Sequence, residues 1–187
     1  MEPVELVMVR DDLSELPRYN LPPGFSCRMF QRGDENLWAQ IETSAGEFAT
    51  ADRAIGHFHK EFGIHQRELC ERCIFIDTGT GESIGTAMAW YGTLLPGGIA
   101  GRLHWVGIRK NYQGLGMGKP LVSRAMQLLS TLHDRAYLTT QTSSYAAVKI
   151  YLDFGFKPYI TDKVQESGWS MMSKRLGFPI IPISYSL

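Results

Sequence analysis

The sequence lacks three features that mark large classes of proteins: an excess of charge of one sign, a long apolar run and a cysteine framework. Lysine plus arginine and aspartate plus glutamate both total 19, so the formal net charge is zero. This balance argues against a general nucleic-acid binder, which usually carries a strong basic bias. No run of about 18 or more apolar residues exists, so no membrane span is expected. The first residues lack a basic-then-apolar signal pattern, and a cytoplasmic protein is the default expectation.

Cysteine is scarce, and its spacing indicates neither a disulfide framework nor a metal site. The three cysteines are Cys27, Cys70 and Cys73, and an odd, low count does not suggest a set of disulfides. Cys70 and Cys73 form a single C-x-x-C pair, whereas structural zinc normally needs two such pairs or added histidines. His65 is the one nearby candidate. We therefore expect no metal and interpret Cys73 as the start of a buried strand.

The 187 residues suggest one folded domain. Proline breaks regular structure repeatedly in residues 1–24, which we interpret as an N-terminal extension laid over the core. The domain itself is expected at residues 25–175. Residues 176–187 form an apolar C-terminal tail that could cover a groove or contact a partner chain, so a homodimer is among the assemblies considered.

Apolar periodicity predicts an alternation of strands and helices. Asp34 and Thr50 are suitable N-caps for two helices, and Ser143 or Ser144 can begin a later one. A further helix follows the glycine-rich stretch described next. This order predicts an α+β sandwich, in which helices flank one mixed, mostly antiparallel central sheet. The predicted strands cover residues 4–9, 25–31, 73–77, 83–91, 102–108, 136–140, 156–160 and 169–174.

The most informative stretch runs from Trp105 to Lys119. An apolar strand ends at Ile108, a polar turn follows, and Gln113-Gly-Leu-Gly-Met-Gly118 then leads into an amphipathic helix. The first backbone N–H groups of a helix have no partner within it, and the helix dipole adds partial positive charge there. Glycines let such a backbone approach a bulky anion closely. The stretch therefore predicts a phosphate-binding loop.

Two common phosphate loops do not fit this stretch. A Walker A loop needs a first glycine where Gln113 stands, and a serine or threonine where Pro120 stands. A dinucleotide-binding fingerprint needs Gly-x-Gly-x-x-Gly, and the spacing here is one residue short. A glycine-rich turn that merely caps a helix is the remaining structural alternative.

A third reading fits without adjustment. The pattern Gln113-x-x-Gly116-x-Gly118 after Val106-x-Ile108 is similar to the acyl-CoA pyrophosphate loop of the GNAT superfamily, the acyl-CoA-dependent N-acyltransferases. A second block, Ser144-x-x-Ala147-x-x-x-Tyr151-x-x-x-Gly155-Phe156, also looks like one of this superfamily, although its first position is commonly asparagine. Two blocks at the expected separation are more specific than either alone, and the order of elements over residues 25–175 agrees.

The resemblance implies an N-acetyltransferase that moves an acetyl group from acetyl-CoA to a primary amine of a small molecule or peptide. The amine would attack directly in a ternary complex, with no metal. Acyl-CoA would lie in a V-shaped opening between the strand ending at Ile108 and the strand from Ala136, with its pantetheine arm along residues 106–108. The implied cofactor-binding residues are Val106, Gly107, Ile108, Gln113, Gly114, Leu115, Gly116, Met117, Gly118, Lys119, Ser144 and Ala147.

An amine nucleophile must be neutral, so a base is useful when the amine pKa is near 10.4. Many family members use a glutamate whose position is taken here by Arg102, and arginine stays protonated. His104 lies on the same face of the strand and is the favoured base, acting through water. The alternative is a sheet histidine with a hydrogen-bond partner. Glu42 and Glu47 are weaker candidates.

Tyr151 matches the general acid of the family, and its phenol can protonate the leaving thiolate. Its alternative role is that of a core aromatic residue. Ser144 is expected to hydrogen-bond the pantetheine or to cap a helix, and Lys119 to contact a phosphate or only solvent. Loss of the usual glutamate at Arg102 leaves open a catalytically silent acyl-CoA-binding or regulatory module.

Overall fold

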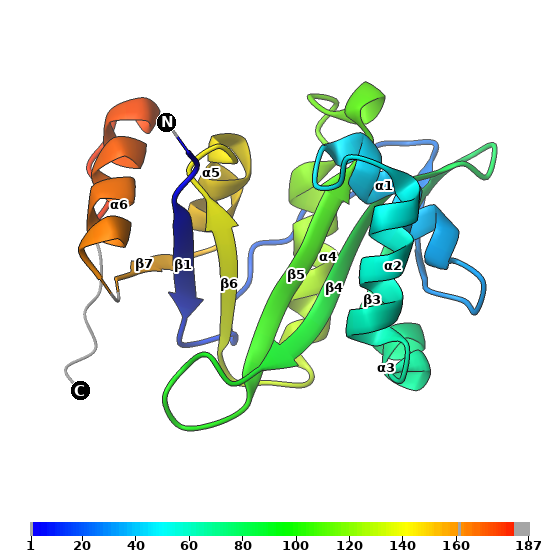
Figure 1. Ribbon diagram of the computed structural model, residues 1–187, viewed down its shortest axis with the longest axis horizontal. Helices are drawn as coiled ribbons and strands as arrows, with labels where there is room; N and C mark the ends of the chain where they lie inside the picture. The colour runs from blue at the N-terminus through cyan, green and yellow to red at the C-terminus, as the bar shows by residue number, and fades with distance from the viewer. Residues whose placement is uncertain (1, 161, 182–187) are drawn as a thin grey trace. The chain divides into compact units, whose positions relative to one another are not determined.

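The computed structural model describes residues 2–160 and 162–181 of the chain (Figure 1). Within this part, no helix is long and apolar enough to cross a membrane. The strands are β1 (Glu5–Arg10), β2 (Phe25–Met29), β3 (Cys73–Thr78), β4 (Ser83–Gly92), β5 (Ala100–Ile108), β6 (Ala136–Gln141) and β7 (Lys157–Tyr159). The helices are α1 (Glu35–Ala45), α2 (Ala51–Phe62), α3 (Gln66–Arg72), α4 (Gly118–Ser130), α5 (Tyr145–Asp153) and α6 (Lys163–Leu176), with a 3₁₀ turn, η1, at Lys110–Tyr112.

The strands form one mixed sheet in the order β2-β3-β4-β5-β6-β1-β7. The β2–β3, β3–β4, β1–β6 and β1–β7 pairs are antiparallel, and the β5–β6 pair is parallel. This arrangement confirms the predicted α+β class with a mostly antiparallel sheet and flanking helices.

The chain divides into two compact units, each described by itself. The loop unit consists of Arg18–Trp90 and Leu103–Leu128, and it contains the glycine-rich stretch. The terminal unit consists of the described residues of Met1–Pro17, Tyr91–Arg102 and Leu129–Leu187.

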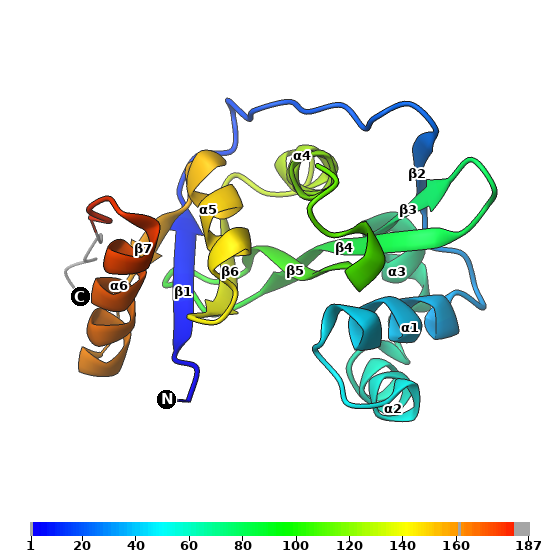
Figure 2. The same ribbon diagram turned by 90° about the horizontal axis from the view of Figure 1, so that it is seen from above.

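In the loop unit, α4 lies on one side of the strands, and α1 and α2 lie on the other (Figure 2). Aromatic rings fill the α1–α2 side: the Trp38 ring centroid lies 5.0 Å from Phe58 and 6.4 Å from Phe62. The predicted cap at Thr50 is present, since its side chain accepts a hydrogen bond from Arg53 N at 3.3 Å. This aromatic core holds α1 and α2 against the sheet.

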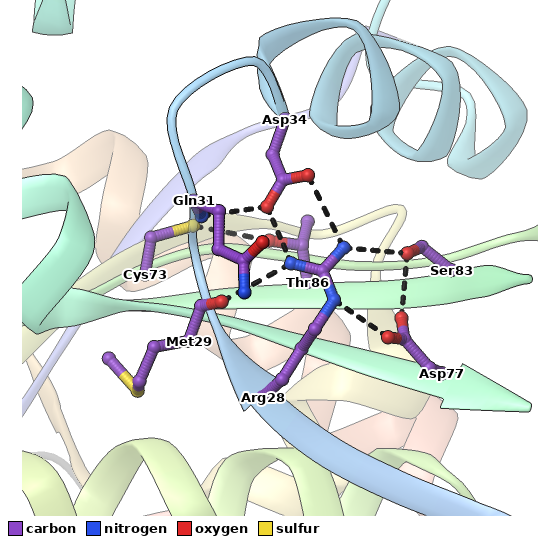
Figure 3. Close-up of polar contacts among 8 residues, drawn as sticks. All are labelled: Arg28, Met29, Gln31, Asp34, Cys73, Asp77, Ser83 and Thr86. Carbon is purple, nitrogen blue, oxygen red and sulfur yellow. Dashed lines mark hydrogen bonds and ion pairs between the residues drawn. The ribbon is translucent and has the colours of Figure 1, made fainter. Parts of the chain in front are cut away.

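Arg28 of β2 joins two strands to the start of α1 (Figure 3). Its guanidinium donates to Asp77 at 2.7 Å, to Asp34 at 2.5 Å and to Ser83 at 3.1 Å. Asp34 precedes α1, as predicted, but its side chain makes no cap hydrogen bond to the helix. It accepts instead from Arg28 and from the Gln31 backbone N–H, at 2.8 Å for the latter. The ion pair, rather than a helix cap, therefore fixes where α1 begins.

The N-terminal residues of the terminal unit lie within the sheet. β1 pairs with β6 on one side and with β7 on the other, and Leu6 to Val9 are buried. The expectation of an extension laid over the core is wrong for these residues. A strand that is buried on both faces has a continuous apolar sequence, and Leu6–Val9 has that form. The division of the chain at residues 24 and 175 stays a prediction.

The strand predicted at Trp169–Lys174 is wrong, because these residues belong to helix α6. Asp162 caps this helix by accepting from Gln165 N, and Gly177 ends it in a left-handed conformation. The buried residues Gln165, Trp169 and Met172 follow the helical repeat. Half of the predicted tail, residues 182–187, lies outside the described part of the chain.

Candidate active site

The glycine-rich stretch forms an exposed loop at the start of α4. Gly114 and Gly116 have φ values of 78° and 83°, and a Cβ added at either would meet no atom of the described residues within 4 Å. Between them, Leu115 is 56% exposed. Left-handed glycines in open space let the backbone curve around a ligand with no side chain in the way. The loop therefore meets the steric requirement for a bulky anion.

Gln113 closes the turn that precedes this loop. Its N–H donates to Lys110 O at 3.3 Å, and its side-chain Nε2 donates to Ile108 O at 2.9 Å. The first hydrogen bond of α4 runs from Leu121 N to Met117 O at 3.1 Å. The N–H of Gln113 is already bonded within the turn. The backbone N–H groups that could bind an anion are therefore those of residues 114–119.

The approach to the loop is fixed by hydrogen bonds to neighbouring elements. Arg109 donates to Ser83 O at 2.8 Å and to Gln40 Oε1 of α1 at 3.0 Å. Lys110 N donates to Ser44 Oγ, also on α1, at 3.0 Å. The Tyr112 hydroxyl donates to Glu82 Oε2 at 2.7 Å. These contacts hold the start of the loop to α1 and to the β3–β4 hairpin, so the loop has a defined origin.

Lys119 contacts an aromatic ring rather than solvent alone. Its Nζ lies 5.2 Å from the centroid of the Tyr19 ring, and Tyr19 N donates to Ser123 Oγ of α4 at 3.1 Å. The segment around Tyr19 thus lies along α4, and the lysine charge is held over the ring at the first turn of that helix.

β5 contains an irregularity at Trp105, which has a φ of 45°. Positive φ in a bulky residue outside a turn is an outlier that the surroundings must hold in place. His104 and Trp105 both reach Glu61 of α2, through His104 Nε2 at 2.8 Å and Trp105 Nε1 at 3.0 Å. His104 therefore has a hydrogen-bond partner, as expected if it were only a structural histidine of the sheet. This partner is a carboxylate, which can also orient the imidazole.

Glu42 of α1 is completely buried, and neither carboxyl oxygen has a hydrogen-bond partner among the described residues. A Cβ at Gly107 of β5 would lie 2.6 Å from Glu42 Oε1, so only glycine fits there. Burial, and to a lesser degree the charge of Glu47, raises the pKa of Glu42 well above its usual value. A raised pKa favours the protonated form of the carboxyl group, and that form cannot accept a proton. Burial also raises the pKa of Glu47.

The second predicted block lies in the terminal unit. Tyr151 of α5 is 7% exposed, and its ring lies edge-on to Phe156 at 6.3 Å between centroids. Ser144 precedes α5, but its side chain makes no cap hydrogen bond, which removes the capping alternative for its hydroxyl. Ala147 is half-buried one turn before Tyr151. The structure thus places these three residues on one helix or at its start.

Arg102, which the sequence resemblance places where a glutamate base would be expected, contacts residues of β6. Its guanidinium donates to Thr139 Oγ1 at 3.3 Å and lies 5.9 Å from the Tyr137 ring centroid. Its Nε is buried and has no hydrogen-bond partner among the residues that the structure describes. Arginine cannot accept a proton, so this position supplies charge and hydrogen-bond donors only.

The cysteines are all free. Cys73 begins β3 as predicted, and burial raises the pKa of its thiol to about 12. Among the described residues, no group of three or more His, Cys, Asp or Glu side chains is placed to hold a metal ion.

Glu61 is the site residue that sequence reasoning missed. Its partners on β5 come from 43 and 44 residues further along the chain, so no local pattern connects them. The one local signal is His57, which lies four residues earlier on the same helix and contacts Glu61 at 2.9 Å.

A family model described as the acetyltransferase (GNAT) family matches residues 36–156. Two curated relatives named mycothiol acetyltransferase, from Streptomyces avermitilis and Streptomyces coelicolor, are each 28% identical over 171 residues. Each match covers 84% of this chain and 52% of the relative. The chain therefore spans about half the length of the curated relatives it matches.

Solved structures show the same fold. A GCN5-related N-acetyltransferase from Sphaerobacter thermophilus aligns with a TM-score of 0.63 and 21% identity, covering 84% of this chain and 49% of that one. A tandem GNAT protein from the clavulanic acid biosynthesis pathway aligns with a TM-score of 0.59 and 14% identity, covering 84% of this chain and 50% of that one.

Proposed function

Because the chain belongs to the acetyltransferase (GNAT) family, we propose that it transfers an acetyl group from acetyl-CoA to a primary amine of a small molecule or peptide. The observation that carries this proposal is the loop at the start of α4. Its two left-handed glycines stand in open space where the first helical N–H groups emerge. A loop of that form suits the diphosphate of coenzyme A.

The proposed cofactor contacts follow from this loop. Backbone N–H groups of residues 114–119 that make no hydrogen bond within α4 would bind the pyrophosphate oxygens. The pantetheine arm would pair with the backbone of Val106–Ile108, as an added strand does. Ile108 O already accepts from Gln113 Nε2, so the arm has to share or displace that contact. Ser144 and Ala147 are proposed as further contacts on the basis of their motif.

The proposed reaction is a direct transfer within a ternary complex. The neutral amine nitrogen attacks the carbonyl carbon of the thioester, so that the C–N bond forms and the C–S bond breaks. The Tyr151 phenol gives a proton to the departing sulfur. The proton that the nitrogen loses passes through water to His104, which its contact with Glu61 holds in one orientation. Both residues then exchange their protons with solvent.

The acceptor is proposed at the level of its chemical class. The name of the curated relatives makes mycothiol-related amines the first acceptors to test. Zero net charge supports a small molecule or peptide over a nucleic acid. The three free cysteines are compatible with a cytoplasmic location, which remains a proposal, as does a homodimer.

A thermal-shift comparison with acetyl-CoA, ATP and NADH tests the cofactor. A ligand present at about 100 times its Kd stabilises a protein by about 2.7 kcal/mol, so acetyl-CoA should raise Tm clearly. Stabilisation by ATP alone would contradict the assignment. Thiol release is then measured with mycothiol-related amines, 2-phenylethylamine, spermidine, glucosamine and a tripeptide. Cofactor binding without release from any amine would favour the silent acyl-CoA-binding module that Arg102 leaves open.

The loop itself is tested by Gly116→Ala. A methyl group at this left-handed position forces the backbone away from the shape that cradles the anion, and acetyl-CoA affinity should fall about tenfold or more, or about 1.4 kcal/mol. Gly33→Ala is the matched control, because Gly33 has a φ of 102° and equally open surroundings in the same unit. Calorimetric titration with acetyl-CoA measures both variants, and equal losses would show that the loop is not the binding site.

A further inference from the structure

Three ring nitrogen atoms meet on one carboxylate beside β5. Glu61 Oε1 contacts His104 Nε2 at 2.8 Å, while Oε2 contacts His57 Nε2 at 2.9 Å and Trp105 Nε1 at 3.0 Å. The exposed fraction of the side chain rises from 11% for His104 to 28% for Glu61 and 41% for His57. The group therefore extends from the interior to the surface of the loop unit.

This convergence depends on the irregular backbone at Trp105. Successive side chains of a regular strand point to opposite faces, so His104 and Trp105 would not both reach one residue of α2. The positive φ of Trp105 brings both rings to the same side. Gly107, three residues after His104, faces Glu42 of α1. In a regular strand, residues three apart point to opposite faces, so this placement also requires one extra residue in the strand. Glu61 thus binds both residues at the bulge.

Glu61 is ionised throughout the neutral range. Burial alone would raise its pKa, but the hydrogen bonds from His104, Trp105 and His57, together with the charge of His104, outweigh burial and lower the pKa to about 2. An ionised carboxylate only accepts hydrogen bonds. Each histidine must therefore carry a hydrogen on the Nε2 that faces Glu61. A neutral imidazole protonated on Nε2 has its lone pair on Nδ1.

We propose that Glu61 is a positioning residue for acetyl transfer, which fixes the Nε2–H tautomer of His104 and thereby makes Nδ1 the atom that takes the amine proton. Within the described part of the chain, the polar groups that contact Glu61 are His57 from its own helix and His104 and Trp105 from β5. Glu61 also holds Trp105 in its unusual conformation, which sets the direction of the strand that follows. The proposal rests on the proposed function, because it assigns His104 the role of the base.

Glu61→Gln tests the proposal, since glutamine keeps the shape but presents an amide nitrogen to one of its ring partners. Nitrogen-15 NMR of the imidazole rings at pH 8, assigned with His104→Gln and His57→Gln, should show both rings as Nε2–H tautomers in the wild type and a mixture in Glu61→Gln. This measurement needs no substrate. A wild-type His104 protonated on Nδ1 would overturn the proposal.

The same variant is then compared with wild type for thiol release from acetyl-CoA, with whichever amine of the panel supports the fastest rate. We expect kcat to fall about 10- to 100-fold with little change in KM for acetyl-CoA. The acid limb of the pH profile should move to lower pH, because the imidazolium loses the anion beside it. An unchanged rate and profile would overturn the proposal, whereas a wild type inactive with every amine would contradict the proposed function instead.

Two matched variants separate positioning from a purely structural effect. Glu68→Gln makes the same chemical change at a second pair on α3, where His65 Nδ1 lies 3.2 Å from Glu68 Oε1, and should leave the rate and pH profile unchanged. Trp105→Phe removes one donor but keeps the ring, so the His104 tautomer and the pH profile should persist. If Trp105→Phe reproduced the whole Glu61→Gln effect, the bulge and not the tautomer would be responsible, and the proposal would fail.

Discussion

Two tyrosines of α5 differ in their surroundings, and this difference allows a controlled test of catalysis. Tyr151 is buried, whereas Tyr145 is exposed and stacks on Arg175, whose guanidinium carbon lies 4.0 Å from the ring centroid. Tyr151→Phe should slow turnover about 10²-fold or more, because the departing thiolate loses its proton donor. Acetyl-CoA affinity should remain nearly intact.

Steady-state thiol release and calorimetric titration measure the two quantities separately. Tyr145→Phe removes a hydroxyl from the same helix and should behave as the wild type in both. An unchanged rate in Tyr151→Phe would remove this residue from the mechanism and leave its role in the core.

A second prediction at the residue scale concerns Glu42. Its pKa is raised in the folded protein by burial and by the charge of Glu47, while in the unfolded chain it has its ordinary value near 4.5. Above that pH the unfolded state loses the proton and the folded state keeps it. Stability should therefore fall as pH rises, by about 1.4 kcal/mol per pH unit from this group, until the folded pKa is reached.

Glu42→Gln, which resembles the protonated acid, should remove this slope. Its Tm should be close to that of the wild type at pH 4.5 and clearly higher at pH 8. Glu35→Gln is the control on the same helix, and it should leave the pH dependence as it is in the wild type. Parallel curves for wild type and Glu42→Gln would show that Glu42 is ionised in the folded protein.

At the scale of elements, Arg28 determines how β2, the β3–β4 hairpin and α1 are held together. Arg28→Met keeps an apolar stem over Phe75, whose ring centroid lies 4.8 Å from the guanidinium carbon, but leaves Asp34 and Asp77 without their cation. We expect a loss of about 2 to 4 kcal/mol in the free energy of unfolding, because both carboxylates are largely buried.

Urea unfolding at pH 7 measures this loss. Arg32→Met, an exposed position in the same connection, should change stability by less than about 0.5 kcal/mol. If the two variants were equally stable, the hydrogen bonds around Arg28 would contribute nothing beyond the packing of its stem.

The element that sequence reasoning assigned wrongly was α6. Residues 169–174 were predicted as a strand, but periodicity alone does not separate a strand from a buried helix segment over so short a length. The helical signals lay outside this stretch, in Asp162 before it and Gly177 after it. Those end signals, and not the stretch itself, identify the element.

At the scale of the whole molecule, local chemistry was predictable and long-range contacts were not. The glycine loop, the helix after it and the Thr50 cap depend on residues near one another in sequence, and each was predicted. Glu61 acts on residues of another element, so neither its role nor the bulge at Trp105 follows from any short pattern. The family match covers residues 36–156, which include both predicted motif blocks.

The buried thiol at the start of β3 has a practical consequence for kinetic work. A colourimetric disulfide reagent that detects liberated coenzyme A also reacts with protein thiolates, and reactivity follows the thiolate population. Burial raises the pKa of Cys73 to about 12 and also raises that of Cys27, so the native background should come mainly from Cys70. When β3 opens, Cys73 becomes reactive, and the same dye then reports loss of the native state in the assay cuvette.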